Sequence, residues 1–341
     1  MSADRLRVGF IGTGLIATFH SKMLRAAEHL IERAGVYDLD VGRAERFAAA
    51  SGHRVVADAE AVLDSCDAVY VCTWTSAHRP LVERAAERGR AVFCEKPLAT
   101  SLRDAEAMAD AVARHGVTNQ IGLILRRSPA YLLARDLIAD PVAGRVMNVV
   151  FRDDQFIPIQ GHYASTWRAD LERAGAGTLL EHSIHDVDML CSLAGPIASV
   201  SARSANFHGH RGIEDSVAAT VAFASGALGT LVSVWHDNLA RPSLRRVEVF
   251  CERRHIVIEG DWFGPVRWTD ADGGTGELAD DELVAATAGL AHDGPHPDVA
   301  FVRAALDGTP ARPDFALGVE AHRVVDAMYR SAAADGAPVE P

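Results

Sequence analysis

Lysine is almost absent from this chain. Of its 34 lysine and arginine residues, only two are lysines, Lys22 and Lys96. Arginine keeps its proton in proteins, whereas lysine can release it when burial or a nearby charge lowers its pKa. A site that needs a reversible proton donor therefore cannot use arginine. Lys96 is either present by chance in an arginine-rich sequence or required as a reversible proton donor. The motifs around it in the sequence distinguish the two possibilities.

Cysteine is also scarce, and its positions are scattered. The chain has five cysteines and no C-x-x-C pair, which favours neither a zinc site nor a disulfide framework. We expect no metal site and small buried thiols in a reducing cytoplasm. These cysteines are Cys66, Cys72, Cys94, Cys191 and Cys251.

Long apolar runs and basic stripes are missing as well. No segment is apolar over the length of a bilayer, and the N-terminal residues enter a strand pattern without a signal-peptide signature. The net charge is −12, which disfavours nucleic acid and anionic membranes as partners. We expect a cytoplasmic protein, and 341 residues are enough for two domains with separate cores.

Residues 1–123 alternate short apolar strand patterns with single helical patterns. Strands without polar alternation, each followed by a helix, indicate a parallel sheet that is covered on both faces. We therefore predict an N-terminal, doubly wound Rossmann domain of the α/β class over residues 1–123. Its strands are expected at 5–12, 35–40, 66–74, 90–97 and 117–125, and its helices at 15–34, 42–52, 78–89 and 101–116.

The pattern changes after Arg126. Long strand patterns with few helices predict an α+β domain over residues 124–341, built on a large, mostly antiparallel open sheet of about six strands. One hairpin is expected to turn at Ser225 and Gly226, and another near Arg253. Residues 266–283 read as a polar, acidic loop, and residues 318–333 as a closing helix.

The first strand pattern runs into a glycine-rich turn, G-x-G-x-x-A, between a strand and a helix. The first glycine permits a tight turn, the second lets the backbone approach a pyrophosphate, and the alanine lets helix and strand pack closely. Asp38 lies at the end of the second strand pattern, where an acidic residue hydrogen-bonds a ribose 2′-hydroxyl. The cofactor contacts predicted here are Gly12, Gly14, Leu15, Ile16 and Asp38.

The choice between cofactors depends on the same carboxylate. Asp38 hydrogen-bonds the ribose of NAD and repels the extra phosphate of NADP, so NAD is favoured. Arg43 and Arg46 lie on the following helix pattern. They either accommodate that phosphate or are solvated surface charges.

Two further segments carry candidate chemistry. Lys96 ends a strand of the doubly wound sheet, at the edge where such folds bind ligands, and Pro97 restricts it to an extended backbone. Glu181, His185 and Asp188 have the spacing i, i+4 and i+7, which places all three on one face of a predicted helix. The alternatives are solvated acids beside a hydrogen-bonded core histidine, or a metal site, which no H-E-x-x-H motif supports.

Together these motifs resemble the glucose–fructose oxidoreductase, inositol dehydrogenase and MocA (Gfo/Idh/MocA) family over nearly the whole chain. The combination of E-K-P with a downstream acid-x-x-x-His-x-x-Asp is the specific part. The matching segments are the glycine motif at 12–17, "TWTSAH" at 73–78, "EKP" at 95–97, "RR" at 126–127, "STWRAD" at 165–170, "GTLLEHSIHDVD" at 177–188 and "VVDAMYRSA" at 324–332.

The resemblance implies an NAD(P)-dependent dehydrogenase or reductase that acts on a hydroxyl or carbonyl carbon of a sugar or cyclitol. It implies catalytic roles for Lys96, Glu181 and His185. Further cofactor contacts would be Thr73, Thr75, His78, Glu95 and Lys96, with His78 alternatively structural. The substrate contacts would be Lys96, Arg126, Trp167, Arg168, His182, His185 and Asp188.

Two positions depart from the family pattern. The acid is usually aspartate and here is Glu181, and Trp74 stands where proline is common. Both put the identity of the substrate in doubt.

In the expected mechanism His185 exchanges the proton of the reacting hydroxyl, Lys96 holds that oxygen or shares the proton, and Glu181 orients His185 or binds a neighbouring hydroxyl. The alternatives are an NAD-dependent glycosidase that acts by transient oxidation and elimination, and a non-catalytic nucleotide-binding regulator.

The second sheet also suggests an assembly. We expect it to expose a face with alternate apolar residues, which needs a cover. Relatives in the family commonly pair sheet to sheet, so a homodimer or homotetramer through this sheet is predicted. The residues expected on that face are Val217, Ala219, Val221 and Phe223.

Overall fold

The computed structural model describes residues 5–290 and 296–341 and divides into two compact units. The first unit contains the described residues up to Leu123 together with His296–Val319, and the second contains the remainder. The sequence assigned 296–319 to the second domain, which needs correction. The end of the first sheet holds this segment, because Gln120 donates to the Pro297 carbonyl at 3.1 Å and Asn119 accepts from the Phe315 amide at 2.9 Å.

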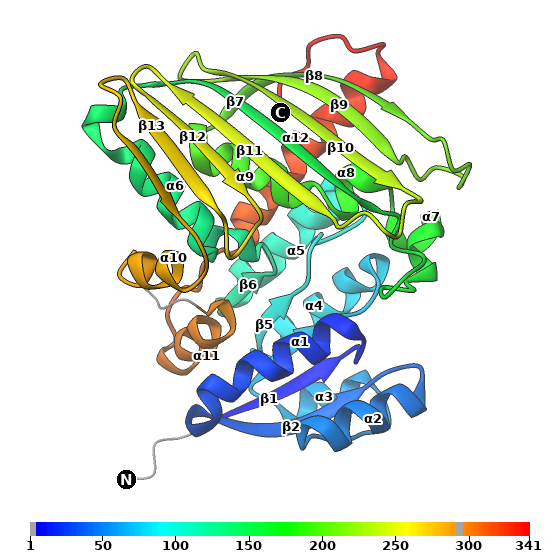
Figure 1. The fold of residues 1–341 in the computed structure, drawn as a ribbon. Coiled ribbons are helices and arrows are strands. Elements are labelled where there is room, and N and C mark those ends of the chain that lie inside the picture. The colour runs from blue at the N-terminus through cyan, green and yellow to red at the C-terminus, as the bar shows by residue number, and fades with distance from the viewer. Residues whose placement is uncertain (1–4, 291–295) are drawn as a thin grey trace. The chain divides into compact units, whose positions relative to one another are not determined.

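The first unit contains the predicted Rossmann fold (Figure 1). Its six strands are all parallel, in the order β3-β2-β1-β4-β5-β6, so the order reverses between β1 and β4. The strands are β1 (Leu6–Ile11), β2 (Ile31–Tyr37), β3 (Arg54–Val55), β4 (Ala68–Val71), β5 (Ala91–Cys94) and β6 (Asn119–Ile121). The helices are α1 (Leu15–Met23), α2 (Val41–Ser51), α3 (Ala59–Ser65), α4 (His78–Glu87), α5 (Leu102–His115) and α11 (Pro297–Asp307).

Several elements in this unit differ from the sequence prediction. The helix expected at 15–34 ends at Met23 and continues as the 3₁₀ helix η1 (Leu24–Leu30), after which Ile31 pairs with Leu6 and begins β2. No glycine or proline marks that change, so helical periodicity concealed it. The short elements β3 and α3 were not predicted, and β6 ends at Ile121, before η3 (Ile124–Arg127).

The second unit is built on an eight-stranded sheet in the order β14-β13-β12-β11-β7-β10-β9-β8. Only the central pair β7 and β10 is parallel. Both predicted hairpin turns are present, between β9 and β10 and between β11 and β12. The strands are β7 (Val146–Phe156), β8 (Ile197–Ala205), β9 (Ser216–Phe223), β10 (Leu228–His236), β11 (Leu244–Cys251), β12 (Arg254–Glu259), β13 (Val266–Asp270) and β14 (Thr275–Leu278).

The segment predicted as an acidic loop is a hairpin instead. Strands β13 and β14 pair with each other, and the helix α10 (Asp280–Thr287) follows. Trp268 lies opposite Gly276, and a Cβ on that glycine would lie 2.1 Å from the indole ring. Gly276 therefore leaves room for the indole of Trp268 between the paired strands. The polar, glycine-rich composition of residues 266–283 had suggested a loop.

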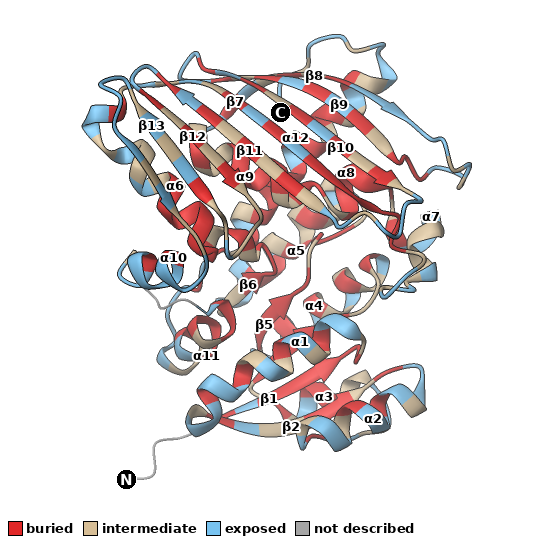
Figure 2. Ribbon diagram, viewed as in Figure 1, coloured by how far each residue is buried: buried red, intermediate tan, exposed pale blue. Residues whose placement is uncertain are grey.

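Helices cover one face of the second sheet (Figure 1). Helix α9 packs on β7, α8 on β10 and α6 on β12. The alternate apolar residues of β9 lie in this core and are at most 6% exposed, so the expectation that they form the open face is wrong. Val150, Leu228, Val232 and Phe250 are exposed and alternate with buried residues along β7, β10 and β11, so they lie on the opposite face. Figure 2 shows this alternation as changing colours along the strands. Besides α10, the helices are α6 (Pro129–Ala139), α7 (Leu171–Ala174), α8 (Thr178–Glu181), α9 (Ile184–Ala194) and, from Glu320 onward, α12 (Phe315–Ala333).

One glycine in this unit has no room for a side chain. Gly177 begins α8, and its amide donates to Glu214 Oε2 at 2.8 Å. A Cβ at this position would lie 1.8 Å from the carbonyl oxygen of Glu214. That oxygen accepts from the Thr178 amide, so it is held in place. The start of α8 therefore depends on glycine.

We expect Gly177→Ala to lower the free energy of unfolding by about 3 kcal/mol or more, because the backbone must move to relieve the contact. Gly289→Ala is the matched control, since nothing lies within 4 Å of its Cβ, and it should change stability by less than about 0.5 kcal/mol. Urea denaturation measures both. Equal stability of the two variants would contradict this description of α8.

Candidate active site

The glycine motif forms the turn that dinucleotide binding requires. Gly12 has φ +85°, and a Cβ there would lie 2.5 Å from the Cys72 carbonyl oxygen, so only glycine fits. Gly14 is the N-cap of α1, with nothing within 4 Å of its Cβ position, and Ala17 is fully buried. An open helix N-terminus beside a tight glycine turn can receive a pyrophosphate.

Asp38 is fixed beside this turn. Its Oδ2 accepts from the Thr13 amide at 2.8 Å and the Thr13 hydroxyl at 3.1 Å, and its Oδ1 accepts from the Asp40 amide at 2.9 Å. Arg43 Nη1 lies 3.3 Å from Oδ1. Asp38 is thus held as an acceptor at the position that the sequence predicted for the ribose.

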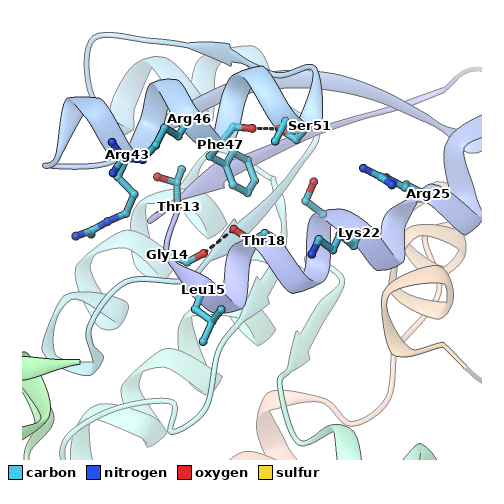
Figure 3. A pocket seen from close by; sticks show the side chains of 12 residues that line it. Thr13, Gly14, Leu15, Thr18, Lys22, Arg25, Arg43, Arg46, Phe47 and Ser51 are labelled. Atoms are coloured by element: carbon cyan, nitrogen blue, oxygen red, sulfur yellow. Dashed lines mark hydrogen bonds between the residues drawn. The ribbon is translucent and has the colours of Figure 1, made fainter. Parts of the chain in front are cut away.

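A groove of about 380 Å³ lies between α1 and α2, next to the glycine turn (Figure 3). Figure 3 shows Lys22 on α1, Arg25 on the following 3₁₀ helix η1, and Arg43 and Arg46 on α2. Four cations make this corner of a strongly acidic chain favourable for phosphate groups. Arg43 and Arg46, which the sequence analysis gave as either phosphate ligands or surface charges, line this groove together with Lys22.

The loops after β4 and β5 are joined by a buried histidine. His78 Nδ1 lies 3.0 Å from the Pro97 carbonyl oxygen, and its Nε2 lies 3.2 Å from that of Thr73. Burial lowers the pKa of His78. Thr75, in the 3₁₀ turn between Thr73 and His78, is also buried, whereas Thr73 is half-buried. His78 therefore braces the two loops that carry the other predicted cofactor contacts.

Lys96 lies two residues beyond the end of β5 and is half-buried. Its amide donates to Glu95 Oε2 at 3.3 Å. Glu95 Oε1 lies 2.8 Å from His20 Nε2, and His20 Nδ1 lies 2.7 Å from Asp298 Oδ1. The sequence reasoning missed His20 and Asp298. Two sequence features could have revealed them. His20 has helical spacing with the buried Ala17 and Leu24, and Asp298 directly follows Pro297.

Glu181 and His185 do not share a continuous helix, which corrects the sequence prediction. α8 ends at Glu181 and α9 begins at Ile184. The hydroxyls of Thr178 and Ser183 both bind the Ser233 hydroxyl on β10, at 2.7 and 2.6 Å, and the Ser183 amide bonds back to the Thr178 carbonyl. The Ser183 amide thus bonds five residues back instead of four, which interrupts the α-helical hydrogen-bond pattern between α8 and α9.

Two acids of this segment are paired with predicted substrate residues. Glu181 accepts from Arg168 Nε at 2.7 Å, and the Arg168 guanidinium lies 4.4 Å from the centre of the Trp167 ring. Asp188 accepts from Arg126 Nε at 2.8 and 2.9 Å. Burial raises the pKa of Asp188 and Arg126 opposes that shift. The second unit thus holds two acid–arginine pairs, and Trp167 packs against the arginine of one of them.

His182 belongs to a buried charge cluster that the sequence did not reveal. Its Nε2 lies 2.7 Å from Asp153 Oδ2 and 3.2 Å from Arg245 Nη2. Arg245 also pairs with Asp186 at 2.7 Å and with Asp261. Burial raises the pKa of Asp186 to about 7, against the opposing charge of Arg245. Asp153 and Arg245 face each other on β7 and β11, so the cross-strand register was the missing information.

The described residues, 5–290 and 296–341, contain no group of three or more histidine, cysteine or acidic side chains that could hold a metal ion. Over the same residues no helix is both long and apolar enough to cross a membrane.

The two halves of the chain match two family descriptions. Residues 6–123 match "Oxidoreductase family, NAD-binding Rossmann fold", and residues 131–257 match "GFO/IDH/MocA C-terminal domain". Among curated relatives, a 1,5-anhydro-D-fructose reductase of Ensifer adhaerens is 34% identical over half of each chain. The myo-inositol dehydrogenase Hyg17 of Streptomyces leeuwenhoekii is 32% identical over 66% of this chain and 69% of that protein.

A solved structure aligns over the whole chain. GenD2 from gentamicin A biosynthesis, in complex with NAD, has a TM-score of 0.83 and 26% identity and covers 100% of this chain and 97% of its own. These findings confirm the predicted fold class and the predicted NAD-binding oxidoreductase.

The pair of Arg168 and Glu181 offers a direct stability test. Glu181 is 3% exposed, so Arg168→Met removes a charge-assisted hydrogen bond from a buried carboxylate and should cost about 3 kcal/mol of unfolding free energy. The double variant Arg168→Met/Glu181→Met should lose less, because it buries no charge. Arg267→Met, at an exposed pair with Glu277, is the control and should cost under about 1 kcal/mol. A double variant less stable than Arg168→Met would contradict this account.

Proposed function

Because the chain belongs to the Gfo/Idh/MocA oxidoreductase family, we propose that it transfers a hydride between NAD and a hydroxyl or carbonyl carbon of a sugar or cyclitol. One observation carries the proposal. The glycine turn, the Thr73 loop and the Lys96 turn follow β1, β4 and β5 of one parallel sheet. The nucleotide site and a candidate proton donor therefore share the carboxyl edge of that sheet.

The residues at the glycine turn fit the cofactor. Gly12, Gly14 and the helix start would receive the pyrophosphate, with the exposed Leu15 and Ile16 beside it, and Asp38 would accept from the ribose. NAD supplies the hydride chemistry when bound. Asp38 favours NAD over NADP, but Arg43 lies beside that carboxylate and could turn towards a 2′-phosphate, so both cofactors belong in the test.

The proton-transfer roles are assigned to two residues. His185 would exchange the proton of the reacting hydroxyl, and Lys96 would hold that oxygen or share its proton, which is worth roughly a hundred- to ten-thousand-fold in rate. Glu181 is bound to Arg168, which supports an orienting or acceptor role rather than that of an acid. The two acid–arginine pairs and His182 would bind neighbouring hydroxyls, as a polyol requires.

The relatives narrow the substrate class that we propose. One is named for an inositol and one for an anhydro-sugar, and both names describe reactions of cyclic polyols. A cytoplasmic setting is part of the proposal, supported by five cysteines that are all free in the structure.

The function is tested by nicotinamide absorbance with a panel of inositols, aldoses, anhydrosugars and glycosides, using NAD and NADP side by side. We expect one polyol to reduce NAD. Lys96→Arg and His185→Gln should each lower kcat at least about a hundredfold, while the affinity for NADH, measured by fluorescence titration, stays within about threefold.

A Lys96→Arg enzyme with normal kcat would remove the proton role from Lys96. Release of an aglycone without net NADH would instead assign the chain to the NAD-dependent glycosidases. Binding of NADH without turnover of any substrate in the panel would favour a nucleotide-binding regulator.

We also propose a homodimer or homotetramer through the uncovered face of the second sheet, where Val150 and Val232 lie on the neighbouring strands β7 and β10. Sedimentation at micromolar concentration should show the oligomer, and Val150→Asp/Val232→Asp should shift it to smaller species by burying charge in the interface. Val284→Asp, at an exposed position of α10, should leave the mass unchanged. A monomeric unmodified protein would contradict this assembly.

A further inference from the structure

A buried imidazole bound by two carboxylates lies directly behind the Lys96 turn. His20 has no exposed surface, and neither has Asp298, while Glu95 is 7% exposed. Each ring nitrogen has its own acid, with Nδ1 2.7 Å from Asp298 and Nε2 2.8 Å from Glu95. Both distances are typical of hydrogen bonds between charged groups.

Counting protons shows what this arrangement requires. A neutral imidazole carries one N–H, so its other nitrogen would face a carboxylate with no hydrogen between them. Both contacts are satisfied only when two protons are shared among the three groups. The simplest such state is an imidazolium that donates to both carboxylates.

The surroundings support the charged state of His20. Burial lowers its pKa, but the charges and hydrogen bonds of Asp298 and Glu95 outweigh burial and raise the pKa to about 10. The titratable groups that face this cluster from the sheet are Tyr70 of β4, Cys72 beyond β4 and Cys94 of β5, whose pKa values burial raises well above their ordinary ranges. These neighbours stay neutral near pH 7, so Glu95 and Asp298 are the anions that His20 balances.

We propose that His20 is a positioning residue for Lys96, acting through Glu95. The chain of contacts runs from Asp298 on α11, through His20 on α1, to the Glu95 carboxylate, which accepts from the Lys96 amide. His78 holds the next residue, Pro97, from the other side. The backbone on both sides of Lys96 is thus fixed by buried histidines. The catalytic consequence rests on the function proposed above, whereas the positioning of Lys96 does not.

Two amide substitutions separate positioning from mere stability. The Gln amide nitrogen can replace Nε2 and keep the bond to Glu95, whereas the Asn amide nitrogen can replace Nδ1 and keep the bond to Asp298. Both variants remove the same positive charge. If His20 positions Lys96 through Glu95, then His20→Asn should disturb Lys96 and His20→Gln should largely preserve it.

The near absence of lysine makes Lys96 observable without an activity assay. Reductive methylation with ¹³C-formaldehyde labels only Lys22, Lys96 and the N-terminal amine, and Lys22→Arg assigns the signals. We expect the Lys96 resonance to shift and broaden in His20→Asn, to stay near its original position in His20→Gln, and the Lys22 resonance to be unchanged in both. An unchanged Lys96 resonance in folded His20→Asn overturns the proposal.

Kinetics provides the second readout. With a substrate from the panel, kcat of His20→Asn should fall about ten- to a hundredfold, and that of His20→Gln by less than about threefold, while NADH affinity is retained in both. His29→Gln, an exposed histidine on η1, is the surface control. Equal losses in the Asn and Gln variants would reduce His20 to a structural role. If the unmodified protein has no activity, the resonances of Lys96 still decide.

If either variant fails to fold, the unmodified protein is tested directly. The ¹⁵N shifts of the His20 ring should show both nitrogens protonated at pH 8, and a neutral ring would overturn the proposal.

The free energy of unfolding should depend on pH with a defined sign. The folded-state pKa lies above the unfolded value of 6.5, so the stabilisation by His20 is complete below about pH 6.5 and is lost as the pH rises towards about 10.

Discussion

The site depends first on the register of the parallel sheet in the first unit. Ile11 of β1 pairs with Tyr37 of β2 and with Val71 of β4, and Val71 pairs with Cys94 of β5. The residues that follow these partners therefore leave the sheet in one row, with neighbouring strands about 4.8 Å apart. Gly12, Asp38, Cys72 and Glu95 are those residues, so a turn, a ribose acceptor, a loop and the neighbour of Lys96 share one edge because of backbone hydrogen bonds alone.

Buried charge is the second constraint, and the two units satisfy it differently. In the first unit one imidazole serves two carboxylates, so the cluster needs a proton in each contact. In the second unit arginines supply permanent positive charge, with Arg245 serving three acids and Arg126 and Arg168 one each. Breaking such pairs leaves uncompensated charge in a medium that solvates it poorly. The positions of these acids are therefore fixed by their ion pairs as well as by the helices and strands that carry most of them.

The sequence predicted those features that depend on local pattern. The glycine motif, the continuous apolar strands, the Lys96 turn and the hairpins around Gly226 and Arg253 all follow from neighbouring residues. The errors arose where distant residues decide. The break between Glu181 and Ile184 depends on Ser233, and the return of 296–319 to the first unit depends on hydrogen bonds to Asn119 and Gln120. All of these partners are too far away in the sequence to affect the hydrophobic periodicity of the segments concerned.

The two lysines show why scarcity alone does not identify a catalytic residue. Lys22 is exposed in a groove with three arginines, where a fourth arginine would supply the same charge. Lys96 is half-buried, follows a carboxylate that a buried imidazole holds, and precedes a proline whose carbonyl a second buried histidine binds. Burying that many polar groups around one turn is costly unless each is hydrogen-bonded, and the bonds formed here hold the turn in place. The strongest argument for Lys96 is therefore the framework behind it rather than the rarity of its residue type.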